Sequence, residues 1–91
     1  MNTQEKIDIL FDNFKEFLKE KNRRYGDSAM SPIQIFSKLD ATEQLFNRVD
    51  DKINRVKNSS ELRKNDLADI FGYCALILIS KDWTDFKDQI D

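Results

Sequence analysis

The chain has 91 residues, 40% of them apolar and 35% charged, and a net charge of −2. This length fits one domain over residues 1–91, and the apolar and aromatic content argues against disorder. Histidine is absent, which excludes a Ser-His-Asp triad and a His-ligated zinc ion, so any metal would be a hard cation such as Mg²⁺ or Mn²⁺. Acidic and basic residues are mixed with no Lys/Arg block, which argues against nucleic acid as a partner.

No segment has the composition of a targeting signal or a membrane span. Residues 1–12 are too polar for a signal peptide, and the longest apolar stretch covers only residues 74–79. We therefore expect a cytoplasmic protein without membrane association. Cys74, the single cysteine, lies in that stretch and is predicted to be a core thiol. Because so small a core is often completed by association, a homo-oligomer (dimer or higher) is expected.

The first half of the chain predicts a long helix, a loop and a short helix. Apolar residues recur at helical spacing over about residues 3–21. Residues 22–31 contain most of the turn formers and are predicted to be the main loop. Ser31 followed by Pro32 is a helix-start signal, which predicts a short helix through Ile33, Phe36 and Leu39.

Two further long helices are predicted in the second half. Asp40, with Glu43 three residues later, resembles a capping box for a helix over about residues 41–57. Residues 58–60 form a turn, and Glu61 suits the positive end of a helix that runs to about Ser80. Asp82 is expected to cap a final helical turn. The fold class is therefore all-α, with three main helices plus short helical pieces in a small bundle.

Four charged residues of the second long helix share one face: Arg48, Asp51, Lys52 and Arg55. Their spacing of three and four residues brings them together on the helix surface. Guanidinium groups fork onto phosphate oxygens, so this face is a candidate phosphate site. The alternative is a solvated helix face with internal ion pairs, and the sequence leaves both open.

The third long helix begins with acids and an amide one turn apart. Glu61, Asn65 and Asp69 follow one another at intervals of four residues, with Asp66 beside them and Tyr73 one turn further on. Such oxygens can share a divalent cation. Asp69 is flanked by apolar residues and needs a partner there. That partner is either a metal ion or a basic side chain of the neighbouring helix, Arg48 or Lys52.

The predicted loop and its approach combine several ligand-binding groups. Lys21, Asn22, Tyr25 and Ser28 offer a cation, an amide, an aromatic ring and a hydroxyl. Gly26 allows a positive φ or a close backbone approach to a ligand. Turns commonly have this composition, so the loop alone is a weak indication.

Taken in order, the three segments resemble a known family. The pattern consists of Lys21-Asn22-x-x-Tyr25-Gly26-Asp27-Ser28, Arg48-x-x-Asp51-Lys52-x-x-Arg55 and Glu61-x-x-x-Asn65-x-x-x-Asp69-x-x-x-Tyr73. It resembles the phage and bacterial "nucleotide modification associated domain" family. That family is similar to the MazG-like all-α nucleoside triphosphate pyrophosphohydrolases. The resemblance covers about residues 21–79.

The resemblance implies a helical bundle, assembled as a dimer or higher oligomer, that holds a nucleotide near Mg²⁺. It implies Asp51, Glu61, Asn65 and Asp69 as metal-side residues, with Asp69 and Glu61 also catalytic. It implies nucleotide contacts from Lys21, Asn22, Tyr25, Arg48, Lys52, Arg55 and Tyr73. Asn65 stands where the pattern has an acid, and residues 41–57 lack the Glu-x-x-Glu pair of the MazG-like enzymes.

Three functions are compatible with these features. The first is a Mg²⁺-dependent enzyme that cleaves a nucleoside triphosphate to monophosphate and pyrophosphate. The second is a non-catalytic binder that sequesters a nucleotide, such as a phage protein that takes up a cyclic signalling nucleotide of host defence. The third is a helical protein-interaction module whose charged faces are merely solvated.

Overall fold

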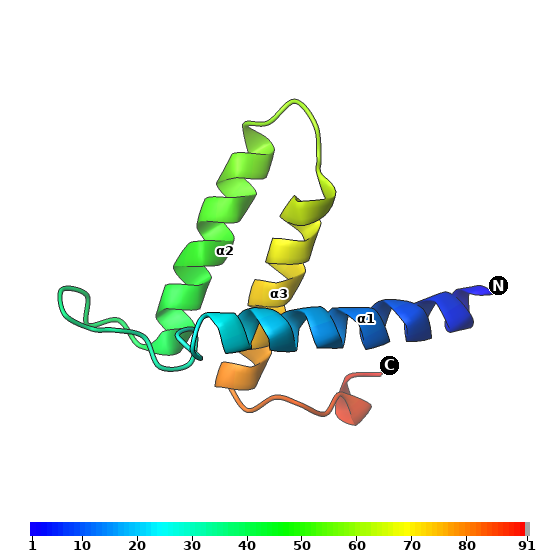
Figure 1. Cartoon of the computed structure of the whole chain (residues 1–91), viewed down its shortest axis with the longest axis horizontal. Coiled ribbons are helices and arrows are strands. Elements are labelled where there is room, and N and C mark those ends of the chain that lie inside the picture. The colour runs from blue at the N-terminus through cyan, green and yellow to red at the C-terminus, as the bar shows by residue number, and fades with distance from the viewer. Residues whose placement is uncertain (91) are drawn as a thin grey trace.

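The computed structural model describes residues 1–90, and this part of the chain is helical without any strand. Three α-helices follow one another: α1 (Thr3–Arg24), α2 (Ala41–Lys57) and α3 (Lys64–Ser80), with a 3-10 helix η1 (Lys87–Gln89) near the end. Helices α2 and α3 form an antiparallel pair, and α1 crosses α3 (Figure 1). The predicted all-α class with three main helices is confirmed.

Helix α1 is longer than its apolar pattern predicts. It begins after Asn2, whose Oδ1 accepts a hydrogen bond from the Glu5 backbone N–H at 2.9 Å. It ends at Arg24 instead of about residue 21, because Glu20 pairs with both Arg23 and Arg24 one turn later. These two hydrogen bonds, that from Arg23 first, lower the pKa of Glu20 below its ordinary value. The predicted start of the loop at residue 22 is therefore wrong.

The short helix predicted from Pro32 to Leu39 is also wrong. Residues 32–39 have no regular helix, and the side chains of Ile33, Ile35, Phe36 and Leu39 are exposed. The Gln34 and Lys38 side chains instead donate to backbone carbonyls of this segment, those of Leu39 and Gln34, at 2.6 and 2.8 Å. A helix this short requires tertiary packing to offset its nucleation cost, and Ile33, Ile35 and Phe36 remain at least 71% exposed.

Helix α2 begins as the sequence predicts. Asp40 Oδ1 accepts from the Glu43 backbone N–H at 2.9 Å. Near this end, the hydroxyl oxygens of Thr42 and Ser80 lie 2.8 Å apart and join the start of α2 to the last residue of α3.

Helix α3 begins three residues later than predicted. The Arg63 backbone N–H donates to Asp66 Oδ2 at 3.2 Å, which fixes the first turn at residue 63. Glu61 lies before the helix, where its backbone N–H and carbonyl both bond to the Ser59 hydroxyl. The prediction that Glu61 opens α3 is therefore wrong.

The C-terminal segment does not form a turn capped by Asp82. Asp82 has a φ of 60° and its backbone N–H donates to the Ile79 carbonyl, so it belongs to the end of α3. The 3-10 helix that follows begins near Asp85, whose Oδ1 accepts from the Lys87 backbone N–H at 3.0 Å.

The interior is small. Among the described residues, Leu45 of α2 is the only fully buried large apolar side chain. Helix α1 contacts α3 through aromatic rings, with the Phe71 ring stacked on that of Phe14 at 4.3 Å and edge-on to that of Phe11 at 5.7 Å. Cys74 is exposed, so the prediction of a core thiol is wrong, because α1 and α2 leave one side of the apolar helix α3 uncovered. No helix within residues 1–90 has the length and hydropathy needed to cross a membrane.

Candidate functional site

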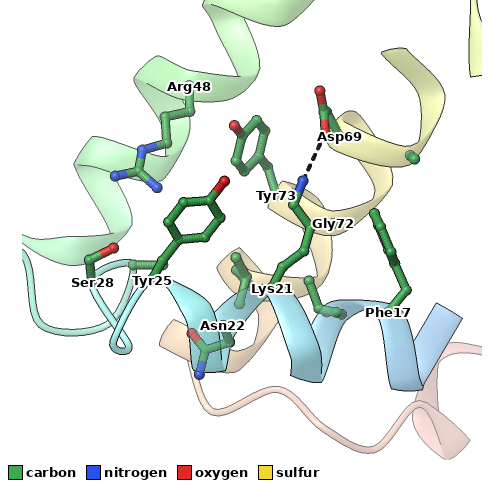
Figure 2. A pocket seen from close by; sticks show the side chains of 13 residues that line it. Phe17, Lys21, Asn22, Tyr25, Ser28, Arg48, Asp69, Gly72 and Tyr73 are labelled. Atoms are coloured by element: carbon green, nitrogen blue, oxygen red, sulfur yellow. Dashed lines mark hydrogen bonds and ion pairs between the residues drawn. The ribbon is translucent and has the colours of Figure 1, made fainter. Parts of the chain in front are cut away.

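A pocket of about 310 Å³ lies where the end of α1 meets α2 and α3 (Figure 2). It brings together predicted site residues from three separate stretches of the sequence. Those that line it are Lys21, Asn22, Tyr25, Arg48, Asp69 and Tyr73. The sequence suggested these residues from pattern, and the fold gathers them into one cavity.

Asp69 is the carboxylate of this pocket, and two lysines neutralise it. Lys52 Nζ lies 2.9 Å from Asp69 Oδ2, and Lys21 Nζ lies 3.4 Å from Asp69 Oδ1. Partial burial acts to raise the pKa of Asp69, but the hydrogen bond and charge of Lys52, together with Lys21, outweigh it and lower the pKa. The sequence left open whether Asp69 pairs with a metal ion or a basic residue, and in the structure it pairs with Lys52 and Lys21.

Asp66 is a buried carboxylate that the sequence pattern placed only beside the predicted metal-side residues. Its side chain is 1% exposed, and its Oδ1 lies 3.7 Å from the Nζ of Lys52, itself 8% exposed. Burial acts to raise the pKa of Asp66, but hydrogen bonds from the Arg63 backbone and side chain, with the charges of Arg63 and Lys52, lower it overall. It lies in the first turn of α3 and accepts from the Arg63 backbone N–H, but arginine is not a usual N-cap residue, so the sequence held no capping signal here.

The turn after α1 positions Tyr25 at the pocket. Gly26 and Asp27 both have a φ of 60°, which reverses the chain directly after Tyr25. The Asn22 amide donates to Asp27 Oδ1 at 3.2 Å and braces the turn. The Tyr25 ring, which is 67% exposed, therefore lies over the pocket between α1 and α2 (Figure 2).

Arg48 and Tyr73 complete the polar lining. Arg48 extends from α2 toward Tyr25, while Tyr73 rises from α3 between Arg48 and Asp69 (Figure 2). Arg48 forms no ion pair within residues 1–90. The pocket thus contains a half-buried guanidinium whose donors are available to an anion.

The remaining predicted residues lie outside the pocket. Asp51 and Arg55 are exposed on α2, and Glu61 and Asn65 are exposed near the start of α3. Lys52 lies behind Asp69 as its ion-pair partner and does not line the cavity. The face shared by Arg48, Asp51, Lys52 and Arg55 is therefore divided among pocket, solvent and interior.

The acids do not form a set that fits Mg²⁺ within one chain. No three acidic or cysteine side chains of residues 1–90 gather closely enough to share a metal ion. Asp69 is the one pocket acid, and the two lysines already compensate its charge. A hard cation prefers several free carboxylate or carbonyl oxygens, which this arrangement does not offer.

No family model, curated protein or solved structure matches the chain. The resemblance to the nucleotide modification associated domain and MazG-like families therefore stays a prediction from the sequence pattern.

The pocket combines positive charge with aromatic surface. Its cations outnumber its carboxylates, since Lys21 and Arg48 face the single acid Asp69. Two tyrosine rings provide flat apolar surface beside these charges. Such a combination suits a ligand that has both a negative group and an aromatic ring.

Proposed function

We propose that this chain is a nucleotide-binding protein that holds its ligand in the pocket between α1, α2 and α3 and releases it unchanged. The observation that carries the proposal is the convergence of Arg48, Lys21, Tyr25 and Tyr73, from three helices and one turn, on a single cavity. These residues supply the two kinds of contact that a nucleotide needs.

Arg48 and Lys21 are the proposed phosphate contacts. Arg48 is free of ion pairs within the described part of the chain, so its fork of donors is available to phosphate oxygens. Lys21 is bound only at 3.4 Å to Asp69 and its side chain is 40% exposed, so its ammonium group keeps donors for a second anion. Together they offset the charge of a phosphate in a half-enclosed site.

Tyr25 and Tyr73 are the proposed base contacts. An aromatic ring that stacks on a base contributes about 1–3 kcal/mol, whatever the base. The exposure of Tyr25 means that a base could cover its ring without rearranging the core. A volume of about 310 Å³ is near the lower end for ligand pockets and suits one nucleotide unit.

Binding without cleavage is preferred to the pyrophosphohydrolase reaction because the predicted metal-side acids do not converge on the pocket. In the enzyme hypothesis, Asp51, Glu61 and Asp69 together hold Mg²⁺, but only Asp69 lines the pocket and it is paired with lysines. A single compensated carboxylate neither collects a divalent ion nor acts readily as a base. A nucleotide sponge, including one for a cyclic signalling nucleotide, needs none of these acids.

The test is binding of a nucleotide panel, linear and cyclic, to purified protein with either Mg²⁺ or EDTA, followed by chromatography of the recovered ligand. We expect one class to bind in EDTA and to be recovered intact. Pyrophosphate released only with Mg²⁺ would establish the enzyme instead. If no nucleotide of the panel binds, the third function, a helical protein-interaction module, would be favoured.

The matched variants are Arg48→Ala and Arg55→Ala, which remove the same charged group from the same helix. Arg48 lines the pocket and Arg55 does not. We expect Arg48→Ala to weaken binding at least about tenfold, since hydrogen bonds to charged groups contribute roughly 1.5–3 kcal/mol. Arg55→Ala is expected to bind like the unaltered protein. Equal losses in the two variants would show that only overall charge matters.

A further inference from the structure

A second cavity lies between α1 and the start of α3. It has a volume of about 620 Å³, and we call it the α1–α3 groove. Its apolar lining residues are Met1, Ile9, Leu10, Phe14, Phe17 and Ala68. Phe17 and Ala68 also line the first pocket, but the two cavities share no charged residue. The groove is therefore a distinct place for a ligand, next to the proposed nucleotide site.

The apolar wall of this groove is open to solvent. Ile9 and Leu10 are 45% and 52% exposed, and Phe17 is 43% exposed. Together with Phe14 they follow one another at helical spacing, so they form one apolar wall along α1. Exposed apolar surface with a polar edge is typical of sites that bind a partner or a ligand.

The charged residues of the groove are basic. Lys6 and Lys64 line it, and no acidic residue among residues 1–90 does. Neither lysine forms an ion pair within the described part of the chain. In a protein whose acids outnumber its basic residues by 17 to 15, this is a local excess of positive charge. The aliphatic stem of a lysine can lie along an apolar wall while its ammonium group stays at the edge.

We infer that the α1–α3 groove binds an amphiphilic anion, namely a monomeric long-chain carboxylate of the fatty-acid type. Its alkyl chain lies along the wall of Ile9, Leu10 and Phe17, and its carboxylate pairs with Lys6 and Lys64. The volume of the groove falls within the range of about 300–1,000 Å³ that is usual for small-molecule sites. This inference does not depend on nucleotide binding.

The shape of the groove favours a small molecule over a partner helix. Helix α1 crosses α3 and does not run alongside it (Figure 1), and α3 contributes only Lys64 and Ala68, one turn apart. A docked helix uses anchors that extend over about two turns. A single alkyl chain needs only the one apolar wall that α1 provides.

The first experiment is isothermal titration calorimetry with dodecanoate, hexanoate and the uncharged glycerol monododecanoate, each below the concentration at which it forms micelles. We expect dodecanoate to bind at least about 100-fold more tightly than hexanoate, because each buried methylene strengthens binding about fourfold. We expect the uncharged ester to bind a few fold more weakly than dodecanoate, since it cannot pair with the lysines. Equal affinities for dodecanoate and the ester would overturn the assignment of an anionic ligand.

Two matched double variants test the lysines. Lys6→Gln with Lys64→Gln removes both cations of the groove, whereas Lys15→Gln with Lys57→Gln removes the same charge from exposed positions that line neither cavity. We expect the first pair to weaken dodecanoate binding roughly three- to tenfold, because exposed ion pairs contribute modestly. The second pair should bind like the unaltered protein. Equal affinities in the two double variants would show that the lysines do not hold the carboxylate.

Substitutions of Leu10 test the apolar wall. Leu10 is half exposed, so Leu10→Ala and Leu10→Glu should keep normal helicity by circular dichroism. We expect Leu10→Ala to weaken dodecanoate binding several fold and Leu10→Glu at least tenfold, since glutamate adds a repelling charge. The control is Gln4→Glu, which adds that charge to α1 outside the groove and should bind normally.

Two results would overturn the inference as a whole. One is the absence of dodecanoate binding by the unaltered chain, and light scattering would then show whether a second copy covers the groove instead. The other is sedimentation of the protein with phosphatidylcholine vesicles without any binding of monomeric dodecanoate, which would indicate a lipid surface as the partner.

Discussion

Lys52 separates two regions of the α2–α3 interface that use similar charges in different ways. On the inner side, Asp66 is almost fully enclosed, and Lys52 and Arg63 are its cationic partners. On the outer side, Asp69 is 21% exposed and faces a pocket that contains Lys21 and Arg48. The Asp66 carboxylate is closed to solvent, whereas in the outer region Arg48 has no carboxylate partner among residues 1–90.

This difference in burial and pairing distinguishes charged side chains that stabilise the fold from those that are available to a ligand. A buried carboxylate needs its cations for the fold itself, because desolvation would otherwise favour its neutral form. A cation at a half-open pocket that has no carboxylate partner is available to a ligand instead. Sequence spacing does not distinguish Lys52 from Arg48, whereas their burial and partners do.

The largest expected effect comes from removing the lysine that both regions share. Lys52→Met leaves Asp66 and Asp69 without their common partner, and breaking a buried pair by removing one member is strongly destabilising. We expect the Tm to fall by more than about 10 °C in a thermal melt followed by circular dichroism. Arg55→Met, which removes a charge from an exposed position on α2, should lower the Tm by no more than a few degrees. Similar decreases in Tm for both variants would show that the ion pairs of Lys52 stabilise the fold no more than an exposed charge does.

Acid should weaken the inner and outer pairs together. The pKa of both Asp66 and Asp69 lies below the ordinary value of 3.8 in the folded chain. Their contribution to stability is therefore fully present above pH 3.8 and is lost as the pH falls through the lowered values. Denaturant titrations at a series of pH values should show this fall, and Asp69→Asn should make it shallower. Asp12→Asn, on the exposed surface of α1, serves as the control and should leave the slope unchanged.

The outer region should bind anions better when its carboxylate is neutral. Asp69→Asn removes the negative charge from the pocket and releases Lys21, so we expect nucleotide affinity to stay the same or to rise by a few fold. Isothermal titration calorimetry of the ligand found in the panel would measure this. A complete loss of binding would contradict the proposed function and would favour a role for Asp69 in holding the ligand or a metal ion.

The smallest effect is expected where α1 meets α3. A Cβ on Gly72 would lie 3.5 Å from Leu18 Cδ1 and 3.7 Å from Phe14 Cζ, which is ordinary van der Waals contact. Because alanine favours a helix over glycine by about 1 kcal/mol, we expect Gly72→Ala to raise the Tm by a few degrees. Gly72→Leu should lower it, since the longer side chain would displace α1. A fall in Tm for alanine as well would show that α1 packs more tightly than these distances indicate.

Local signals in the sequence predicted much of the fold. The apolar periodicity gave the three long helices, and Asp40 gave the start of α2 because a cap depends only on neighbouring residues. The segment of residues 32–39 was predicted as a helix because Ser31 and Pro32 form a genuine start signal. What the sequence did not reveal is that Ile33, Ile35 and Phe36 stay at least 71% exposed, because their burial depends on tertiary packing.

Several residues of the candidate site were predictable from the sequence. Which residues of the α2 face line the pocket, and which are buried or exposed, was not. The pattern named Lys21, Arg48 and Tyr73, which the fold brings to one pocket. It also grouped Lys52 and Arg55 with Arg48, because spacing along one helix does not show which of its residues are covered by another helix. The burial of Asp66 was not predicted for the same reason, since it depends on how α2 packs over α3.

The length of α1 connects two distant parts of the surface. The same 22-residue helix carries Ile9 and Leu10 in the α1–α3 groove, beside the start of α3, and Lys21 at the pocket. Anything that occupies the groove and moves this helix therefore changes how closely Lys21 lies to Asp69 and with it the affinity for the pocket ligand. Thermodynamic linkage then requires the pocket ligand to change binding at the groove by the same factor.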